Sequence, residues 1–443
     1  MNEITLRASG IWRKSRYLRN SFARINRFPR ELLGHIHTFL ESEHDLINAT
    51  AVCRHWRAVL LAAPYLWCHI SGSSTSKIRA YLERSKWHPL NVRLTSSNLA
   101  QLLHQHIRRV VSLRLDLSGQ SHMEQIAAHL LEPAPSLRAL SIHSRHIGHM
   151  LDIPPSFLGG SFPSLRKLFV EDLSSFSGPH TFPSVTSLTL HTSFDISLNT
   201  ADLLHTLERL PSLETLFIGF RSRGMPTLIT GDRVVSLPNL RTMTLLSTNH
   251  MDGARMGPIL PGLHLPKLEK LNVHSCSTFQ SNGPCFPLSF SRLLPTFSEL
   301  PRAVLIPSLW FTEIHLQTER QHTLDISIGR RSRFEETREV LGGLPLRSVR
   351  FLTIEFRDAD LEWLFGMLGV MEGVEDLDIR GRWTQVLGFW QESQERKRFC
   401  PALRNLVVHG GGGGRHNLAA FTDARNGVGL PLTMAYVASG GGD

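Results

Sequence analysis

The phrase Pro135-Ser136-Leu137-Arg138-Ala139-Leu140-Ser141-Ile142 decides how most of this chain folds, because variants of it recur along the sequence. In its second half, Leu140 and Ile142 alternate with the polar Ser141, which predicts a short strand with one buried face. The leading proline marks the start of that strand, where a missing backbone donor is harmless. Each copy therefore predicts a turn followed by a strand.

Nine further copies follow this pattern of leading turn and alternating apolar residues. The apolar residues that anchor the ten copies are Val110, Leu137, Leu165, Val185, Leu213, Leu240, Leu268, Val349, Val374 and Leu403. From Val110 to Leu268 the anchors are 27, 28, 20, 28, 27 and 28 residues apart, and the last three are 25 and 29 apart. A period in the twenties with alternating leucines is the signature of leucine-rich repeats. We predict parallel strands, stacked in one curved sheet, at 138–143, 166–171, 186–191, 214–219, 241–246, 269–274, 350–355, 375–380 and 404–409.

The segments between and after these copies are less regular. Residues 123–131 and 200–210 have helical patterns, as expected of the return path in each unit. Residues 275–345 are the least regular part, with possible degraded copies at 306–309 and 323–328 and a loop insertion at 279–298. The tail from Gly410 is rich in glycine and is expected to be poorly ordered.

Near the N-terminus, the stretch INRFPRELLGHIHTFLESEHDLINATAVCRHWRAVLLAAPYLW at residues 25–67 predicts three short helices. Pro29 suits a first helical turn, and apolar residues from Leu32 to Leu40 recur at helical spacing. Asp45 is the expected N-cap of a second helix, whose apolar face runs to Trp56. About 45 residues cannot bury all of these side chains alone, so the surplus apolar surface predicts a partner.

This stretch resembles the F-box, the motif that binds the Skp adaptor of SCF-type cullin–RING ubiquitin ligases. The resemblance rests on Phe28-Pro29-Arg30-Glu31-Leu32-Leu33, Asp45-Leu46, Val52-Cys53-Arg54-His55-Trp56-Arg57 and Pro64-Tyr65-Leu66-Trp67. His37 replaces the usual apolar residue after Ile36, which is expected to weaken adaptor contact. Residues 75–94 continue the resemblance to F-box proteins of mushroom-type fungi, with a helix at 76–86 and a strand at 90–94. The alternative is a helical stretch that packs only against the rest of the chain.

The resemblance implies a set of residues that bind the Skp adaptor. They are Pro29, Leu32, Leu33, Ile36, Leu40, Leu46, Val52, Cys53, Trp56, Leu66 and Trp67.

The repeats are similar to the irregular leucine-rich repeats of F-box proteins. The usual asparagine after each strand is absent, and His143, His191 and His274 stand there instead, so no regular asparagine ladder is expected. The implied fold is α/β: an N-terminal three-helix F-box followed by an irregular leucine-rich-repeat solenoid with a curved parallel sheet. The implied boundaries are a basic extension at 1–24, the F-box at 25–70, a helix–strand connector opening the solenoid at 71–105, the solenoid at 106–410 and a Gly-rich tail at 411–443.

Residues between the buried leucines of each strand are expected to face the concave side, where repeat proteins bind partners. The predicted substrate-binding residues are Arg138, Ser141, His143, Lys167, Phe169, Glu171, Thr215, Phe217, Lys270, Asn272, His274, Asp376, Asp378 and Arg380. Phe169 and Phe217 stand out because aromatic residues are frequent interface hot spots, with packing against neighbouring strands as the alternative. The charge changes from basic to acidic along the array, which would orient a bound partner.

The composition agrees with a cytoplasmic or nuclear protein that works by binding. No run of 18 uncharged apolar residues occurs, so no membrane span is expected. The five cysteines are scattered and never form C-x-x-C, which favours free thiols in a reducing compartment. They are Cys53, Cys68, Cys276, Cys285 and Cys400.

The formal net charge is +10, and much of the basic excess lies before residue 31, in a stretch without acids between Ile4 and Arg30. Three interpretations stay open: a solvated extension, an arm that directs the chain to the nucleus or touches nucleic acid, and a mitochondrial presequence. The F-box pattern begins directly afterwards, which leaves little room for a cleaved leader.

No catalytic, metal-binding or cofactor-binding constellation is expected. Gly410–Gly414 lacks the Lys and Ser or Thr that a phosphate-binding loop needs after its last glycine. His143, His146 and His149 are spaced by three, but no carboxylate or cysteine accompanies them.

We therefore expect a non-enzymatic adaptor that binds the Skp adaptor and the cullin scaffold through the F-box, and an unidentified protein substrate through the solenoid. Neither a membrane nor nucleic acid is expected as a partner. The alternative is a non-catalytic interaction scaffold that binds the Skp adaptor outside ubiquitination.

Overall fold

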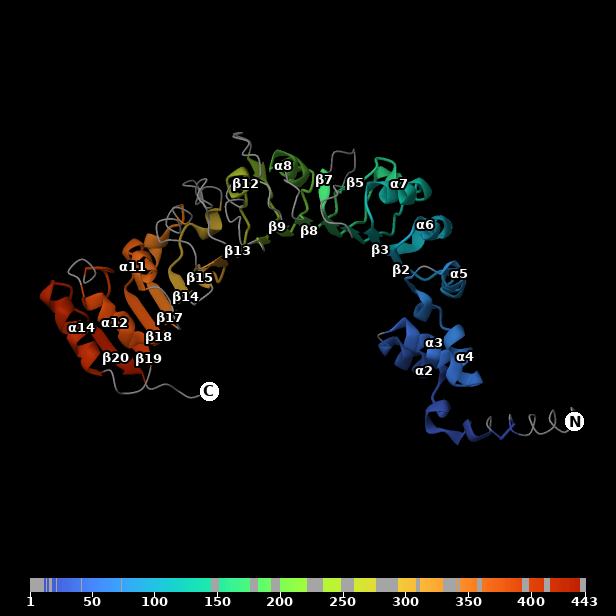
Figure 1. Cartoon of the computed structure of the whole chain (residues 1–443), viewed down its shortest axis with the longest axis horizontal. Coiled ribbons are helices and arrows are strands. Elements are labelled where there is room, and N and C mark those ends of the chain that lie inside the picture. The colour runs from blue at the N-terminus through green and yellow to red at the C-terminus, as the bar shows by residue number, and fades with distance from the viewer. Residues whose placement is uncertain are drawn as a thin grey trace, which may run out of the picture.

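The computed structural model describes residues 12, 14–15, 18–20, 22–40, 42–72, 74–144, 151–175, 182–192, 200–220, 234–247, 259–275, 294–307, 311–329, 341, 343–356, 361–392, 398–409 and 415–438. They form an arch with a helical unit at its N-terminal end, one long curved sheet along its inner side and helices along its outer side (Figure 1). The architecture is mixed α/β, with a large and mostly parallel sheet.

Within the described residues, sixteen strands form one continuous sheet. Neighbouring strands are parallel except around β15, which runs antiparallel to both β14 and β16. In order across the sheet, the strands are β1 (His69–Ile70), β2 (Leu90–Leu94), β3 (Val110–Leu117), β4 (Ala139–Ser144), β6 (Lys167–Glu171), β8 (Ser187–Thr192), β9 (Thr215–Phe220), β11 (Thr242–Ser247), β13 (Lys270–Ser275), β16 (Thr323–Gly329), β15 (Phe311–Gln317), β14 (Arg302–Pro307), β17 (Phe351–Phe356), β18 (Asp376–Gly381), β19 (Asn405–His409) and β20 (Met434–Ala438). Two short pairs lie apart from it: β5 (Leu151–Asp152) with β7 (Leu173–Ser175), and β10 (Val235–Ser236) with β12 (Leu263–His264).

All nine strands predicted from the repeats are present in this sheet, each beginning one residue later than predicted. The strand predicted at 90–94 is β2, and the copy anchored at Val110 is β3. The possible copy at 323–328 is β16, parallel to β13. Of the possible copy at 306–309, residues 306–307 belong to β14 and residues 308–309 lie outside the described part. The expected insertion at 279–298 is described only from residue 294.

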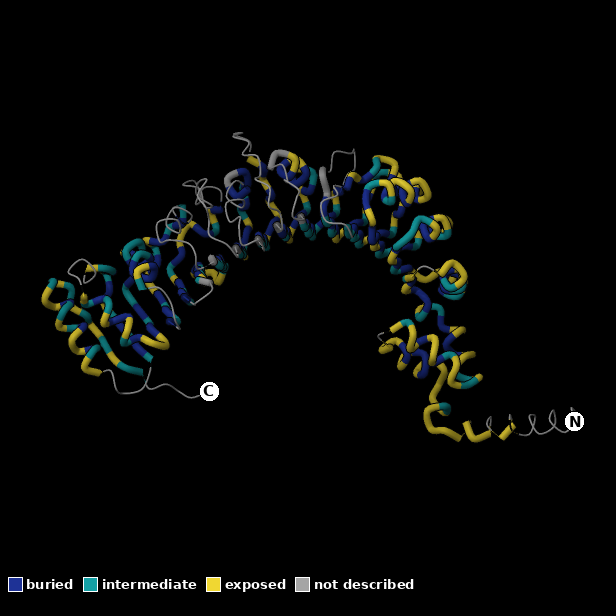
Figure 2. The backbone as a smooth tube through the Cα atoms, in the orientation of Figure 1, coloured by how far each residue is buried: buried dark blue, intermediate teal, exposed yellow. Residues whose placement is uncertain are grey.

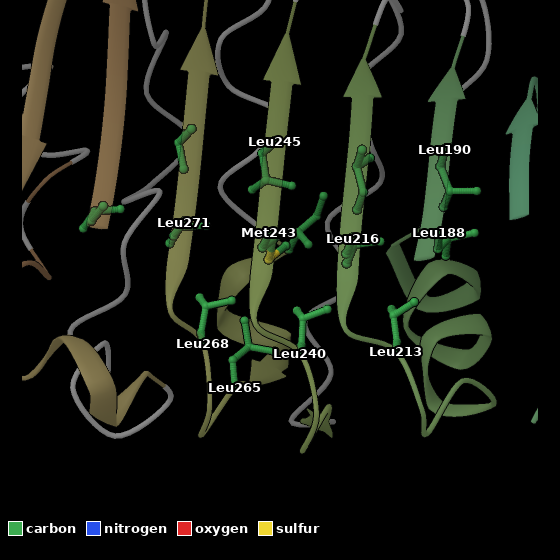
Figure 3. Close-up of a cluster of buried hydrophobic side chains, with 14 of the residues drawn as sticks. Leu188, Leu190, Leu213, Leu216, Leu240, Met243, Leu245, Leu265, Leu268 and Leu271 are labelled. Atoms are coloured by element: carbon green, nitrogen blue, oxygen red, sulfur yellow. The ribbon is translucent and has the colours of Figure 1, made fainter. Parts of the chain in front are cut away.

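The sheet is held together by the side chains that alternate toward the outer layer. Leu188, Leu216, Met243 and Leu271 stand in register on four neighbouring strands and are all buried (Figure 3). Buried residues follow the arch in this way from end to end (Figure 2). Burying a large apolar side chain contributes about 1.5–3 kcal/mol, so each strand depends on its neighbours for most of its stability.

In two copies, the polar residue after the leading proline links the copy to the one before it: Ser212 donates a hydrogen bond to the Pro183 carbonyl (2.7 Å), and Asn239 donates one to the Pro211 carbonyl (3.1 Å). Thr296, which follows Pro295, makes a similar bond to the Pro266 carbonyl (3.2 Å). These bonds satisfy carbonyl groups at the turns and join neighbouring segments of the array.

Helices fall into two groups. The N-terminal unit consists of η1 (Arg24–Arg27), α2 (Arg30–Ile36), η2 (His37–Phe39), α3 (Glu43–Val52), α4 (Arg54–Leu61) and η3 (Pro64–Trp67). The outer layer contains α5 (Thr75–Arg84), α6 (Ser97–Leu103), η4 (His104–Arg109), α7 (Gln120–His129), η5 (Phe157–Gly160), α8 (Thr200–Glu208), η7 (Leu260–Gly262), η8 (Pro295–Phe297), η9 (Leu346–Ser348), α11 (Leu361–Val370), α12 (Trp383–Gln391) and α14 (Arg415–Gly427). The helical segments expected at 76–86, 123–131 and 200–210 correspond to α5, α7 and α8.

The expectation of a poorly ordered tail after Gly410 is wrong for residues 415–438. Leu418 and Phe421 are buried on α14, and β20 extends the main sheet in parallel with β19. The glycine-rich run dominated the composition of this segment and masked the helical spacing that follows it. Residues 410–414 and 439–443 lie outside the described part.

Candidate functional site

The N-terminal helical unit is divided differently from the prediction. The single helix expected from Asp45 to Trp56 is two helices, because Cys53 adopts an extended conformation with φ −156° and ψ 169°. Ser42, not Asp45, is the N-cap of α3, since its Oγ accepts a hydrogen bond from the backbone N–H of Asp45 at 3.1 Å. Cys53 caps α4 in turn, because its Sγ accepts the backbone N–H of Trp56 at 3.4 Å. The break at Cys53 sets the angle between α3 and α4.

His37 belongs to the interior of this unit. Its Nδ1 donates to the carbonyl oxygen of Leu33 at 2.6 Å. Its ring meets that of Trp56 edge-on, with centroids 4.8 Å apart, and the Trp56 indole donates to Asn26 Oδ1 at 2.6 Å. The histidine that interrupts the apolar pattern is therefore a buried, hydrogen-bonded residue, and its side chain is not on the exposed surface of α2.

Exposed apolar side chains are concentrated on the same unit. Of the nineteen large apolar side chains that are exposed among the described residues, ten lie between Ile25 and Tyr65. The most exposed of these are Phe39 (74%), Val52 (59%) and Leu32 (52%). An apolar surface gathered on so small a unit marks a place for a partner.

The residues predicted to bind the Skp adaptor divide into three groups by exposure. Pro29, Leu32, Ile36, Leu40 and Val52 are exposed; Cys53, Trp56 and Leu66 are half-buried; Leu33, Leu46 and Trp67 are buried. The exposed group can touch a partner directly, whereas the buried group fixes the helices that present it. Phe28, Phe39 and Ile47 are also exposed apolar residues of this unit, but they were not predicted to bind the adaptor. Their positions in the sequence, next to residues that were predicted, could have indicated them.

The helical unit is joined firmly to the strands and helix that follow it. The Trp67 indole donates to the carbonyl oxygen of Leu60 at 2.9 Å and packs edge-on against Tyr81 of α5. An ion pair of 2.7 Å links Glu43 of α3 to Lys77 of α5. Burial, reinforced by the nearby Glu43 carboxylate, raises the pKa of Tyr81, so its phenol stays protonated. These contacts hold the N-terminal helical unit in a fixed position at the end of the main sheet.

Comparison with known families identifies this unit. Residues 25–73 match the family model for F-box-like domains. The chain thus carries an F-box-like domain, and such domains bind the Skp adaptor of SCF complexes, in which F-box proteins typically serve as non-catalytic adaptors for substrates. No curated protein matches the chain.

The second candidate site is the concave face, which comprises the strand residues on the side of the main sheet away from the outer helices (Figures 1 and 2). Most predicted substrate-binding residues lie there, because they alternate with buried leucines on their strands: Ser141, His143, Lys167, Phe169, Glu171, Thr215, Phe217, Lys270, Asn272, His274, Asp376, Asp378 and Arg380. Whether they bind a substrate stays a prediction. His143, His191 and His274, the last residues of three predicted strands, lie in β4, β8 and β13, each of which continues one residue further.

Arg138 is not part of the strand. It lies one residue before β4, and within β4 the alternation places Ala139, Ser141 and His143 on the concave face. Arg138 is exposed at the turn, where its carbonyl oxygen accepts the backbone N–H of Arg166 at 2.8 Å. Whether Arg138 contributes to substrate binding stays a prediction.

Four rings on the concave face form an aromatic ladder, made of His143, Phe169, His191 and Phe217. Successive ring centroids are 4.4, 5.4 and 5.1 Å apart. All four residues are half-buried, so the two phenylalanines pack against neighbouring strands and still present part of each ring to solvent. Gly219 makes room for the ladder, because a Cβ there would stand 2.7 Å from Nδ1 of His191.

Beside the ladder lies an arginine pair, Arg93 of β2 and Arg114 of β3, which the sequence did not single out. Both guanidinium groups bind the buried carboxylate of Asp116, Arg93 at 2.5 Å and Arg114 at 2.9 Å. Burial alone would raise the pKa of Asp116, but the hydrogen bonds from the two arginines outweigh it and lower this pKa. The alternation of polar residues in both strands placed these side chains on the concave face, but only the register between strands showed that they meet.

The other half of the concave face is richer in carboxylates. Asp376 accepts a hydrogen bond from Asn405 at 2.6 Å, and Asp378 lies 3.1 Å from Arg380. On the antiparallel pair β15–β16, His315 lies 2.8 Å from Asp325. The hydrogen bond that His315 donates to Asp325 raises the pKa of His315, although burial works against it.

Two further properties bear on function. No helix in the described ranges is both long and apolar enough to cross a membrane. Among described residues there is no group of three or more His, Cys, Asp or Glu that could hold a metal ion. Of the three histidines at 143, 146 and 149, the last two lie outside the described residues.

Proposed function

We propose that this chain is the substrate-binding subunit of an SCF-type cullin–RING ubiquitin ligase. The F-box-like domain binds the Skp adaptor, which connects the chain to the cullin scaffold. The observation that carries this proposal is the match of residues 25–73 to the F-box-like family, on a unit whose exposed apolar surface is left uncovered by the described rest of the chain.

The array behind the F-box-like domain is, in this proposal, an irregular leucine-rich-repeat solenoid. Three features support this: the strand spacing in the twenties, the buried leucines in register, and the hydrogen bonds from Ser212 and Asn239 to the proline carbonyl of the preceding copy. Leucine-rich solenoids bind proteins on their concave side. The concave face, with its aromatic ladder, is the proposed substrate site.

Such a subunit accelerates ubiquitin transfer by proximity. The contacts between the F-box-like domain and α5 hold the domain in place against the sheet, and so keep the substrate at a constant distance from the cullin-bound enzymes. Holding two reactants together in this way raises the rate without any catalytic residue in the chain itself. No cofactor is part of the proposal. A cytoplasmic or nuclear location fits it, since its partners act there and Cys53, Cys68 and Cys400 are free thiols.

The test is co-purification of the full chain with a Skp adaptor and a cullin. Exposed apolar residues of the F-box-like domain should carry the contact, so Leu32→Asp combined with Val52→Asp should reduce adaptor capture at least tenfold. The matched control is Trp87→Asp, which places the same charge on an exposed apolar residue outside the domain. Adaptor capture without cullin would favour a scaffold outside ubiquitination. Equal capture by the double variant and the control would refute the proposed surface.

A further inference from the structure

The arginine pair, Arg93 and Arg114, is built in a way that leaves hydrogen-bond donors available. Nε of Arg93 and Nε of Arg114 donate hydrogen bonds to the Asp116 carboxylate, and Nη2 of Arg93 forms an ion pair with it. The side chain of Asp116 is 3% exposed. The two arginine side chains are themselves 50% and 45% exposed. Among described residues, neither guanidinium has another acidic partner. The carboxylate therefore fixes the direction of both arginines, while the remaining N–H groups stay open to solvent.

Such a pair is suited to bind an anion. A guanidinium offers five donors in a planar fork that matches a carboxylate or a phosphate, and a fork held in place loses little freedom on binding. A charge held by a buried counter-ion is also insensitive to pH near neutrality. Lys167, on β6, adds a third exposed cation two strands from Arg114, and within the described strands β2, β3, β4 and β6 the carboxylates are those of Asp116 and Glu171. The local charge thus favours an anionic partner.

The aromatic ladder begins directly beside this pair. Arg114 is aligned with Ser141, and Asp116 is aligned with His143, the first ring of the ladder. The ladder then continues through Phe169 and His191 to Phe217 on β9. Half-buried rings in a row offer an apolar surface that is already ordered, so a ligand that covers them gains contact area at little entropic cost. Charge and apolar surface therefore stand next to each other on one face.

The distance across these strands sets the length of a matching ligand. From β3 to β9 the sheet takes four steps, through β4, β6 and β8. At about 4.8 Å a step, the span is roughly 19 Å. An extended chain covers about 3.3 Å per residue, so about six residues bridge the arginine pair and the far end of the ladder.

We propose that this part of the concave face docks an extended segment of a substrate protein, in which an anionic side chain and an apolar or aromatic side chain lie within about six residues of each other. The anion binds Arg93 and Arg114, and the apolar side chain covers Phe169 and Phe217. The inference deepens the proposed function, on which it rests, by naming the chemistry of the substrate. The anion can be a carboxylate of the chain or an added phosphate.

Peptide arrays test the proposal with the full chain, both alone and mixed with a Skp adaptor. Each pool fixes one position as Asp, phosphoserine, Ser or Asn, fixes a second position two to six residues away as Phe, Leu or Gly, and leaves the others degenerate. Pools with an anion and an apolar residue should bind about tenfold better than the matched Ser or Asn pools. The Asp and phosphoserine arms distinguish the two sources of the anion. The preference should fall as NaCl rises from 50 to 500 mM, because exposed charges are screened.

Three variants assign the preference to residues. Arg93→Gln with Arg114→Gln and Asp116→Asn removes the charges while keeping hydrogen-bonding groups, and should abolish the preference for the anion. Phe169→Ala with Phe217→Ala should abolish the preference for Phe or Leu and keep that for the anion. The matched control, Arg241→Gln with Glu269→Gln, removes an exposed ion pair that lies just before two strands and should change neither.

Equal binding of anionic and neutral pools by the unaltered chain, or an undiminished anion preference in the triple variant, overturns the inference. Should the triple variant fail to fold, a salt-independent preference in the unaltered chain overturns it equally. Adaptor and cullin co-purification separates this result from the larger proposal. Intact co-purification without anion preference removes only the inference, whereas anion preference without adaptor binding removes the proposed function.

Discussion

The indole ring of Trp67 meets the phenol ring of Tyr81 edge-on, with ring centroids 5.0 Å apart. Trp67 closes the F-box-like domain and Tyr81 belongs to α5, the first helix of the outer layer, so one aromatic contact serves both parts. The guanidinium of Arg84 lies over the Trp67 ring, 4.5 Å from its centroid. A partner bound to the F-box-like domain is thereby held in a fixed relation to the sheet.

Replacing Trp67 with alanine should therefore destabilise the F-box-like domain and its connection together. Removal of a large aromatic side chain from a well-packed site costs about 3–5 kcal/mol. Trp87→Ala is the matched control, since Trp87 is 90% exposed against 1% for Trp67. That change should stay within about 0.5 kcal/mol. Urea unfolding followed by circular dichroism checks both; similar midpoints for the two variants would show that Trp67 does not support the junction.

Gly219 gives a second prediction, because two rings of the aromatic ladder, those of His191 and Phe217, lie close to it. An added methyl group at Gly219 would approach His191 Nδ1 to 2.7 Å and a ring carbon of Phe217 to 3.1 Å. Gly219→Ala should displace the ladder and destabilise the chain by about 1–3 kcal/mol. Gly388→Ala provides the contrast: it lies in α12 with no atom within 4 Å of an added Cβ, so alanine should stabilise by about 0.5–1 kcal/mol. Thermal unfolding of both variants measures the difference in sign, and a stabilising Gly219→Ala would contradict the packing described.

The strands could be predicted because the pattern that specifies each strand lies within one short segment of the sequence. Leu140 and Ile142 alternate with Ser141 within one short phrase, and a buried row on one side of a strand needs nothing more than that alternation. The direction of β15 could not be read in this way, since an antiparallel strand has the same alternation as a parallel one. Only its place between β14 and β16 shows the direction.

The binding surfaces could not be predicted in full, because they depend on contacts between residues that are far apart in the sequence. The arginine pair comes together because Arg93 and Arg114 are aligned across two strands, and this register is not visible in either strand alone. The sequence showed His37 only as a departure expected to weaken adaptor contact; its interior position, held by a hydrogen bond to Leu33 and by the edge of the Trp56 ring, follows from the packing of the helices. The sequence indicated an F-box-like domain correctly, whereas the exposure of each side chain required the packing of all its helices.

His315 gives a prediction about pH. Its pKa is raised, chiefly by the hydrogen bond to Asp325, with Glu313 as a second carboxylate neighbour at 3.4 Å. A group whose pKa is higher in the folded state contributes stability that is fully present below its unfolded pKa of about 6.5 and is lost as the pH rises through the folded value. His315→Gln should therefore destabilise the chain at pH 6 and have a smaller effect at pH 9.

Urea unfolding at the two pH values measures this difference. In an Asp325→Asn background the effect of His315→Gln should depend much less on pH, because the carboxylate that raises the pKa is gone. A loss of stability that is equal at pH 6 and pH 9 would mean that His315 contributes only through packing.

Arg425 gives the last prediction, at the C-terminal end of the sheet. Its guanidinium is buried and donates to the carbonyl oxygens of Phe399 (2.8 Å), Cys400 (3.1 Å) and Leu430 (3.3 Å). These bonds tie α14 to the turn before β19. A buried carbonyl left without a donor costs about 1–3 kcal/mol, so Arg425→Met should release α14 and β20 from the sheet.

The thiol of Cys400 reports on this release. Burial raises its pKa to about 12, so in the intact chain the thiol is protonated and shielded from alkylation at pH 8. Arg425→Met should speed alkylation of Cys400 by iodoacetamide at least tenfold, as located by mass spectrometry, while Arg425→Lys should give an intermediate rate because it retains some donors. Hydrogen exchange in α2 to α4 should be unchanged, since these helices lie at the opposite end of the arch (Figure 1). An alkylation rate of Cys400 that is the same in Arg425→Met as in the unaltered chain would show that the buried arginine does not hold α14 in place.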